Sequence, residues 1–246
     1  GAVVVSGRVL ADDAAFGMKL IASMLREPHF DDMEIERLRK KTLGELVSVA
    51  DNPGRLTALF HNRHVFGEHP YGRRIAGYRN TIDSFDRNTV VRTHRERFLR
   101  NGALLTVVGD VNADSVRKNA EELFGFIDKG DNTETPGVTP PVSYGLQVHC
   151  IDKPEFTQSH IYIGGLGIRR NDPDYFKLRV AGTLLGGSFT SRLNESVRVK
   201  EGLTYGIRST FSALRSGGSV HTTTFTKTES TKRAVGLILD ELEQMA

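Results

Sequence analysis

A tract rich in proline, glycine, threonine and aspartate interrupts the chain just past its middle and constrains the fold more than any other feature. Residues 128–145 read DKGDNTETPGVTPPVSYG, a composition typical of an exposed linker. The chain has 246 residues. That length accommodates two domains of about 120 residues, each large enough for a hydrophobic core of its own. We therefore expect domains at residues 1–128 and 146–246, joined by a linker at 129–145.

Strand-like and helix-like patterns occur in both halves. Apolar or alternating runs predict strands at 3–10, 103–108, 146–151, 160–164, 205–213 and 218–226. Helical periodicity and capping residues predict helices at 12–25, 33–50, 53–65, 86–99, 114–124, 173–185 and 190–199, and a last one from residue 230. Strand pairs such as the one joined through LRSGG favour antiparallel pairing. The pattern predicts an α+β fold of two related domains, each a mixed, largely antiparallel sheet covered by helices.

The charge and hydropathy patterns argue against two classes of partner. The chain has 33 lysines and arginines against 30 acidic residues, and they are dispersed, so nothing calls for nucleic acid. No apolar run approaches the roughly 20 residues that cross a bilayer, and we expect no transmembrane segment. Gly1 stands where an initiator methionine would, and Ala246 falls inside an amphipathic run, so we expect the parent protein to be longer.

The single cysteine, Cys150, excludes an internal disulfide and a zinc cluster built on cysteines. It lies in the alternating apolar run LQVHCI. We therefore expect a buried structural thiol, because unpaired cysteine behaves as a small hydrophobic residue.

The stretch SRLNESVRVKEGLTYG, residues 191–206, holds the most informative pair of side chains. Arg198 supplies a planar, permanently charged fork and Tyr205 a phenolic donor. On adjoining elements such a pair can hold and polarise a peptide carbonyl. The plain alternative is a salt-bridged surface arginine beside a half-buried strand tyrosine.

The glycines and polar residues around this pair form a recognisable signature. They resemble the second-domain signature of the pitrilysin, insulinase and mitochondrial processing peptidase family of zinc metallopeptidases: Gly186, Gly187, Ser191, Arg192, Leu193, Arg198, Gly202, Leu203 and Tyr205. The resemblance implies that Arg198 and Tyr205 contact the substrate backbone near the scissile carbonyl in a closed chamber. Gln158, at the entry to a predicted strand, is a candidate to line the peptide path.

The same resemblance implies zinc chemistry, but this chain carries only part of a zinc site. In the family, an upstream His-x-x-Glu-His helix supplies two histidines, and Glu45 aligns with the glutamate ligand. Only 44 residues precede Glu45, and none of them forms that motif, so Glu45 would bind metal only if the histidine helix lies upstream. Otherwise the parent is a non-catalytic subunit and Glu45 a solvent-facing glutamate. Leu38, where active members carry a second glutamate, favours the non-catalytic version.

A second group of ligand-type side chains does not have metal-site spacing. It comprises His61, His64, Glu68 and His69. The inverted zinc motif needs two histidines four residues apart on one helical face, whereas His64 is one residue off that register. Gly67 and Pro70 would also break the helix. We expect surface and loop-packing roles for these residues.

The sequence therefore predicts a fragment that binds unfolded peptide and supplies Arg198 and Tyr205 to the active site of a zinc-bearing segment or partner subunit. The alternative is a catalytically inactive structural or assembly subunit of the same family. We expect zinc in the complete protein or its partner and none on this chain alone. The implied partners are a peptide or protein substrate and a related subunit in a homo- or hetero-oligomer. The compartment stays undetermined; family analogy points to a bacterial periplasm or cytoplasm.

Overall fold

The computed structural model describes residues 3–97, 103–127, 140–141 and 145–245. The chain forms two compact units, residues 1–43 with 78–135 and residues 44–77 with 136–246. Each unit thus combines segments from distant parts of the chain, and the boundary falls inside one long helix. The expected domains at 1–128 and 146–246 stay a prediction, and most of the expected linker lies outside the described residues.

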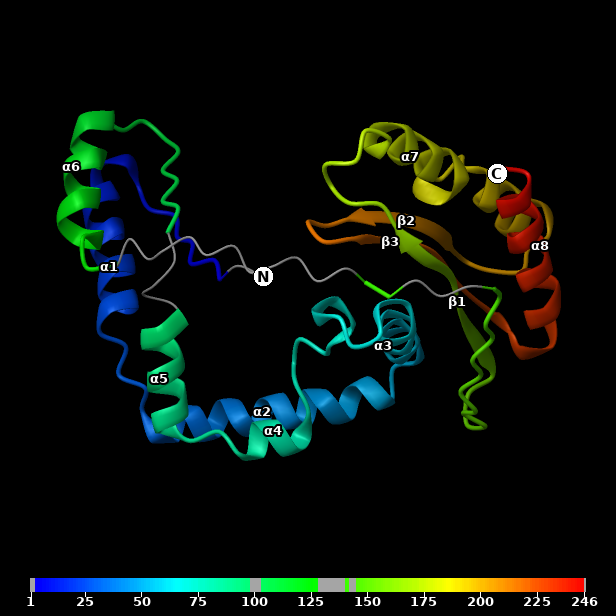
Figure 1. Ribbon diagram of the computed structural model, residues 1–246, viewed down its shortest axis with the longest axis horizontal. Coiled ribbons are helices and arrows are strands. Elements are labelled where there is room, and N and C mark those ends of the chain that lie inside the picture. Colours follow the sequence, from blue (N-terminus) through cyan, green and yellow to red (C-terminus); the bar gives the residue numbers. More distant parts are fainter. Residues whose placement is uncertain (1–2, 98–102, 128–139, 142–144, 246) are drawn as a thin grey trace. The chain divides into compact units, whose positions relative to one another are not determined.

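The first unit is built from helices in the part of the chain described. These are α1 (Ala14–Arg26), the beginning of α2 (Asp32–Ala50), α4 (Arg79–Asp83), α5 (Arg87–Arg97) and α6 (Ala113–Phe124), with a short 3-10 turn at Ala11–Asp13 (Figure 1). Helix α1 packs on α6. The guanidinium of Arg87 donates to the carbonyl oxygens of Phe30 at 2.9 Å and His29 at 3.1 Å, which fixes the start of α5 against the loop before α2.

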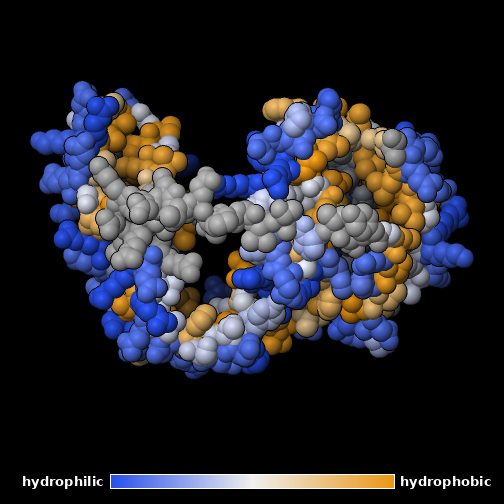
Figure 2. All heavy atoms as spheres, viewed as in Figure 1, coloured by the Kyte–Doolittle hydropathy of each residue, from blue (hydrophilic) through white to orange (hydrophobic). Residues whose placement is uncertain are grey.

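Three of the predicted strands are wrong for the described structure. Residues 3–10 and 103–108 of the first unit, and 146–151 of the second, are not part of any strand. Their apolar side chains are largely exposed, as at Val4 and Leu104, and Figure 2 shows hydrophobic residues on the visible surface of both units. A strand is stable only when its backbone groups pair with a neighbour, and no described strand lies beside these segments.

The second unit contains an antiparallel sheet in the order β1-β3-β2. The strands are β1 (Gln158–Gly167), β2 (Ile207–Ala213) and β3 (Gly218–Lys227), as predicted within a few residues. The register sets Gln158 opposite Lys227, and Ile207 opposite Thr224. The sheet and its helices confirm the α+β class.

Helices cover both faces of this sheet (Figure 1). One face packs on α7 (Tyr175–Gly182), two π-helical turns, η3 (Thr183–Gly187) and η4 (Asn194–Lys200), and α8 (Thr231–Glu243), which follows the 3-10 turn η5 (Thr228–Ser230). The core on that side consists of Leu185, Leu193, Val197, Ile207 and Ile238. The other face receives α3 (Pro53–Phe66), which runs along β1 and is followed by the 3-10 turn η2 (Pro70–Gly72).

Cys150 is exposed, which corrects the expectation of a buried thiol. The alternating pattern of its segment would bury every second side chain only if the segment paired as a strand. Residues 146–151 do not form a strand in the described structure, so their alternation does not bury one side of the segment.

Within the described residues, no helix combines the length and the hydrophobicity that crossing a membrane requires.

Candidate functional site

Asn194 connects the three segments that make up the candidate site. Its side-chain nitrogen lies 3.1 Å from three acceptors, the carbonyl oxygens of Ser188 and Ile207 and the hydroxyl of Ser191. Asn194 is buried, and its bonds join the loop after the Gly-Gly pair, the start of η4 and the first residue of β2. Sequence reasoning missed this residue; the signal was an asparagine between the apolar positions Leu193 and Val197, both fully buried.

The Gly-Gly pair permits a close approach between η3 and β2. A Cβ atom on Gly186 would lie 2.5 Å from the backbone nitrogen of Ser209 and 2.7 Å from its Cβ. No side chain fits there without moving backbone, so glycine at this position lets η3 lie directly against the sheet.

Arg198 lies on η4, four residues after Asn194, and is half-buried. Its guanidinium carbon lies 4.2 Å from the centre of the Phe189 ring, a cation–π contact. Within the described part of the chain its N–H groups have no ion-pair or hydrogen-bond partner. The salt-bridged arginine considered as the alternative is therefore not what the structure shows.

Tyr205 precedes β2, and 89% of its surface is exposed. The backbone on both sides of it is held. The Leu203 N–H donates to the carbonyl of Val197 at 3.1 Å, and the Thr226 hydroxyl donates to the Leu203 carbonyl at 2.7 Å. After Tyr205, the Gly206 N–H donates to the Thr204 hydroxyl at 3.1 Å. A phenol that projects from such a fixed backbone is presented to solvent with little reorganisation needed for contact.

The bond between Leu203 and Val197 also relates the two candidate residues to each other. Val197 immediately precedes Arg198, and Leu203 lies two residues before Tyr205, so the loop returns to the end of η4. Gly202 allows this return because its φ is +61°, a conformation that disfavours other residues. No hydrogen bond joins the Arg198 and Tyr205 side chains themselves among the described residues.

The other two predicted residues lie in the same unit. Gln158 begins β1 opposite Lys227, and Ile207, two residues after Tyr205, lies opposite Thr224. Both therefore lie toward the same end of the sheet on opposite sides of β3, two strand spacings (about 10 Å) apart across the sheet and three residues (about another 10 Å) apart along it. Glu45 is exposed on α2, where its carbonyl accepts the Ser48 hydroxyl at 2.9 Å.

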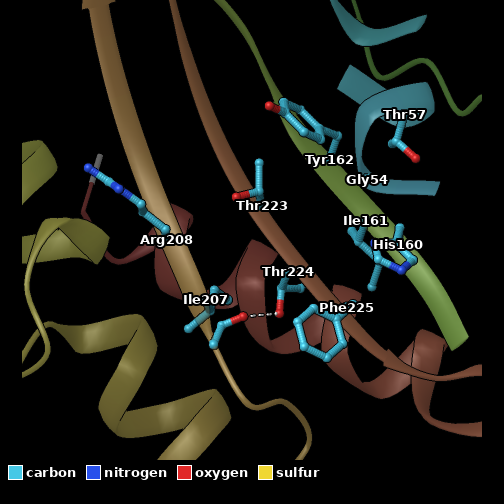
Figure 3. A pocket seen from close by; sticks show the side chains of 11 residues that line it. Gly54, Thr57, His160, Ile161, Tyr162, Ile207, Arg208, Thr223, Thr224 and Phe225 are labelled. Carbon is cyan, nitrogen blue, oxygen red and sulfur yellow. Dashed lines mark hydrogen bonds between the residues drawn. The ribbon is translucent and has the colours of Figure 1, made fainter. Parts of the chain in front are cut away.

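A pocket of about 440 Å³ opens on the α3 side of the sheet (Figure 3). It is lined by Gly54 and Thr57 of α3, His160, Ile161 and Tyr162 of β1, Gly206, Ile207 and Arg208 at the start of β2, and Thr223, Thr224 and Phe225 of β3. The register places the side chains of His160, Tyr162, Arg208, Thr223 and Phe225 on one face. Sequence reasoning did not find this pocket, because it depends on which residues pair across strands.

Burial shifts the pKa values of two side chains that line the pocket. It lowers the pKa of His160, which therefore stays neutral near pH 7, and it raises the pKa of the Tyr162 phenol. Arg208 is thus the one permanently charged side chain among the lining residues, and none of them is acidic.

Histidines also line the contact between α3 and the sheet. The His61 ring lies 4.8 Å from Tyr162 and 5.5 Å from His221, centre to centre. Burial, with smaller contributions from His221 and His64, lowers the pKa of His61 to about 4. His61 Nε2 and His221 Nδ1 are buried and have no hydrogen-bond partner among the described residues, so this contact suits neutral imidazoles only.

The described residues do not form a zinc site. No group of three or more histidine, cysteine, aspartate or glutamate side chains comes together in them. His69 is buried, and its Nδ1 accepts the Tyr71 N–H at 3.1 Å, while Glu68 pairs with Arg63. One carboxylate, such as that of Glu45 on α2, does not hold zinc without imidazole ligands beside it.

Comparison with known proteins identifies the family of the chain. The model of the family described as the peptidase M16 inactive domain matches residues 84–246, more than half of the chain. The chain belongs to this family. Its resemblance to zinc metallopeptidases is thereby confirmed.

Individual relatives agree with this assignment. The chain is 26% identical over 212 residues to an uncharacterized zinc protease, YmxG, of Bacillus subtilis, covering 86% of this chain and 50% of the relative. It is 24% identical over 229 residues to the non-peptidase homolog YmxG of Helicobacter pylori, covering 91% of this chain and 52% of the relative. The chain thus spans about half the length of the curated relatives it matches.

Solved structures share the fold. A peptidase M16 inactive domain from Pseudomonas fluorescens superposes with a TM-score of 0.79 at 23% identity, over 96% of this chain and 57% of that one. Pitrilysin superposes with a TM-score of 0.66 at 16% identity, over 96% of this chain and 26% of that one. At these identities the likeness concerns the fold alone.

Proposed function

We propose that this chain binds unfolded peptide and supplies Arg198 and Tyr205 to the active site of a zinc-bearing segment or partner subunit that hydrolyses the peptide bond. The observation that carries the proposal is the presentation of Tyr205. Its phenol is almost fully exposed, while hydrogen bonds hold the backbone on both of its sides.

The chemistry of the pair suits a backbone carbonyl. Tyr205 offers one O–H donor, and Arg198 offers a charged fork whose N–H groups are unpaired among the described residues. Donors fixed before the reaction stabilise the negative charge that develops on a carbonyl oxygen during hydrolysis. Gln158, at the same end of the sheet, would contact the peptide alongside them.

The chain does not carry the metal chemistry in this proposal. Zinc held by another segment or subunit would activate the attacking water. Glu45 would join its ligands only beside histidines that the described residues do not provide. A related subunit, identical or different, is the implied partner.

One observation favours a second function, that of an inactive structural or assembly subunit. The relative from Helicobacter pylori is named a non-peptidase homolog. In that case Arg198 and Tyr205 would have no role in cleavage.

Reconstitution separates the two functions. The purified chain is mixed with a relative that carries the His-x-x-Glu-His helix, and cleavage of a fluorogenic peptide is measured. Removal of a single oxyanion donor by Tyr205→Phe should lower the turnover by about a hundredfold or more. The exposed Tyr78 provides the matched control Tyr78→Phe, which should leave the rate unchanged. Equal rates for Tyr205→Phe and the parent chain would favour the structural role.

A further inference from the structure

The pocket beside α3 has the size and walls of a side-chain subsite. Its volume of about 440 Å³ falls in the range of small-ligand pockets. The Phe225 ring stacks on His160 at 5.6 Å with an interplanar angle of 26°, and Tyr162 stacks on His221 at 4.9 Å and 27°. Figure 3 shows Phe225, His160 and Tyr162 around the pocket, with Thr57 of α3 beside them. These stacked rings offer flat, largely apolar walls, which suit an aromatic side chain.

Uncompensated positive charge lies at the rim of this pocket. Arg208 extends from β2, is exposed, and has no ion-pair or hydrogen-bond partner for its guanidinium in the described part of the chain. Lys227, two residues beyond Phe225 on the same strand, is a second exposed cation on this face. Since no lining residue is acidic, a ligand that fits the pocket gains from a carboxylate near the rim.

The pocket begins next to the proposed peptide contact. Gly206 lines it and directly follows Tyr205, so their Cα atoms are about 3.8 Å apart. In a peptide whose carbonyl contacts the Tyr205 phenol, a side chain one or two residues away from that carbonyl would therefore reach the pocket. Neither Arg198 nor Tyr205 lines the pocket, so this contact is separate from theirs.

We propose that the pocket is a specificity subsite for a peptide segment in which an aromatic side chain stands next to a carboxylate. The ring enters between Phe225, Tyr162 and α3, and the carboxylate pairs with Arg208. This inference rests on the proposed peptide-binding function. The carboxylate has two sources, an internal aspartate or glutamate or the peptide's own C-terminus, and the peptides below distinguish them.

The test is a set of fluorescein-labelled, unstructured peptides titrated with the full chain and followed by fluorescence anisotropy. One peptide carries an internal Phe-Glu pair and an amidated C-terminus; its partners carry Phe-Gln or Ala-Glu instead, and a fourth ends in phenylalanine with a free carboxylate. We expect the Phe-Glu peptide to bind about three- to tenfold more tightly than the Phe-Gln and Ala-Glu peptides. Tighter binding of the free C-terminal phenylalanine would identify the terminal carboxylate as the source.

Variants of the chain make the assignment specific. Arg208→Gln should remove the preference for the Phe-Glu peptide over the Phe-Gln peptide. Arg208→Glu should bind a Phe-Lys peptide more tightly than the Phe-Glu peptide. Arg117→Gln, which removes an exposed arginine on α6, is the control with the same charge change and should behave as the parent chain. Thr223→Phe fills the pocket from the central strand and should weaken the binding of every peptide that contains phenylalanine. Circular dichroism checks the folding of this variant.

Two outcomes would overturn the inference, and they differ in what else they overturn. If all peptides bind equally, and Arg208→Gln changes nothing, the subsite is wrong while peptide binding stands. If no peptide binds at all, the proposed function fails together with the subsite.

Discussion

Replacing Asn194 with alanine should destabilise the second unit more than any ordinary surface change. The substitution leaves the Ser191 hydroxyl and the Ile207 carbonyl, both in buried surroundings, without the donor they now share. Each unsatisfied buried group costs about 1–3 kcal/mol, so we expect a loss of about 2–4 kcal/mol in the free energy of unfolding. For a chain of this length that corresponds to a fall in Tm of roughly 5–15 °C.

Urea denaturation followed by circular dichroism measures this loss. Asn194→Asp is the sharper variant, because it keeps the shape and replaces the donor by a second acceptor that faces the carbonyl oxygens of Ser188 and Ile207. It should be at least as unstable as Asn194→Ala near pH 7. Asn112→Ala is the matched control, an asparagine at the cap of α6 whose side chain accepts the Ser115 N–H at 2.9 Å. Removing this cap should lower the free energy of unfolding by about 1 kcal/mol. If Asn194→Ala costs no more than the control, Asn194 does not hold the candidate site together.

Three further results are expected. His61 has a pKa of about 4 in the folded chain against an ordinary 6.5. The unfolded chain therefore binds the extra proton, and the free energy of unfolding falls as the pH falls from about 6.5 to 4. Allowing for partial solvent contact, His61→Gln should abolish about 1–2 kcal/mol of that pH dependence, and an equal effect of the exposed control His29→Gln would contradict burial as the cause. Gly186→Ala should lower the free energy of unfolding by about 1–3 kcal/mol because its methyl group meets the Ser209 backbone. Gly44→Ala, which has open space on α2, should raise the free energy of unfolding by roughly 0.5–1 kcal/mol. Similar free energies for the two variants in urea denaturation would refute the close approach of η3 to β2. Metal analysis of the purified chain should find no stoichiometric zinc, and one tightly held zinc per chain, lost in Glu45→Gln, would show that this chain holds the metal.

Local signals predicted the helices and the sheet strands well. Asn52 and Asn112 cap α3 and α6 through the hydrogen bonds that their positions imply, and the β2–β3 pairing follows from two alternating runs around a glycine-containing turn. The three failed strands had equally apolar patterns. Their formation depends on partners that a local pattern does not reveal, and the error over Cys150 follows from the same cause.

The site could be predicted only in part. The glycines and the spacing of Arg198 and Tyr205 follow from the family signature, and family membership is confirmed. The Thr204 bond that helps to fix Tyr205 is local, but the bond from Thr226 to Leu203 and the bond from Asn194 to Ile207 join residues 23 and 13 positions apart, which a local pattern does not reveal. The pocket at Arg208 depends on strand register in the same way. Whether Arg198 and Tyr205 touch a substrate stays a prediction.

Photo-crosslinking tests that prediction most directly. Benzoylphenylalanine is placed at position 205 in one chain and, as a control, at the exposed position of Phe176 on α7 in another. Each chain is irradiated with an unstructured, labelled peptide, and the products are analysed by mass spectrometry. The proposed function predicts a covalent adduct between position 205 and the peptide backbone region, and none at position 176. No adduct at position 205, or equal adducts at both positions, would contradict it.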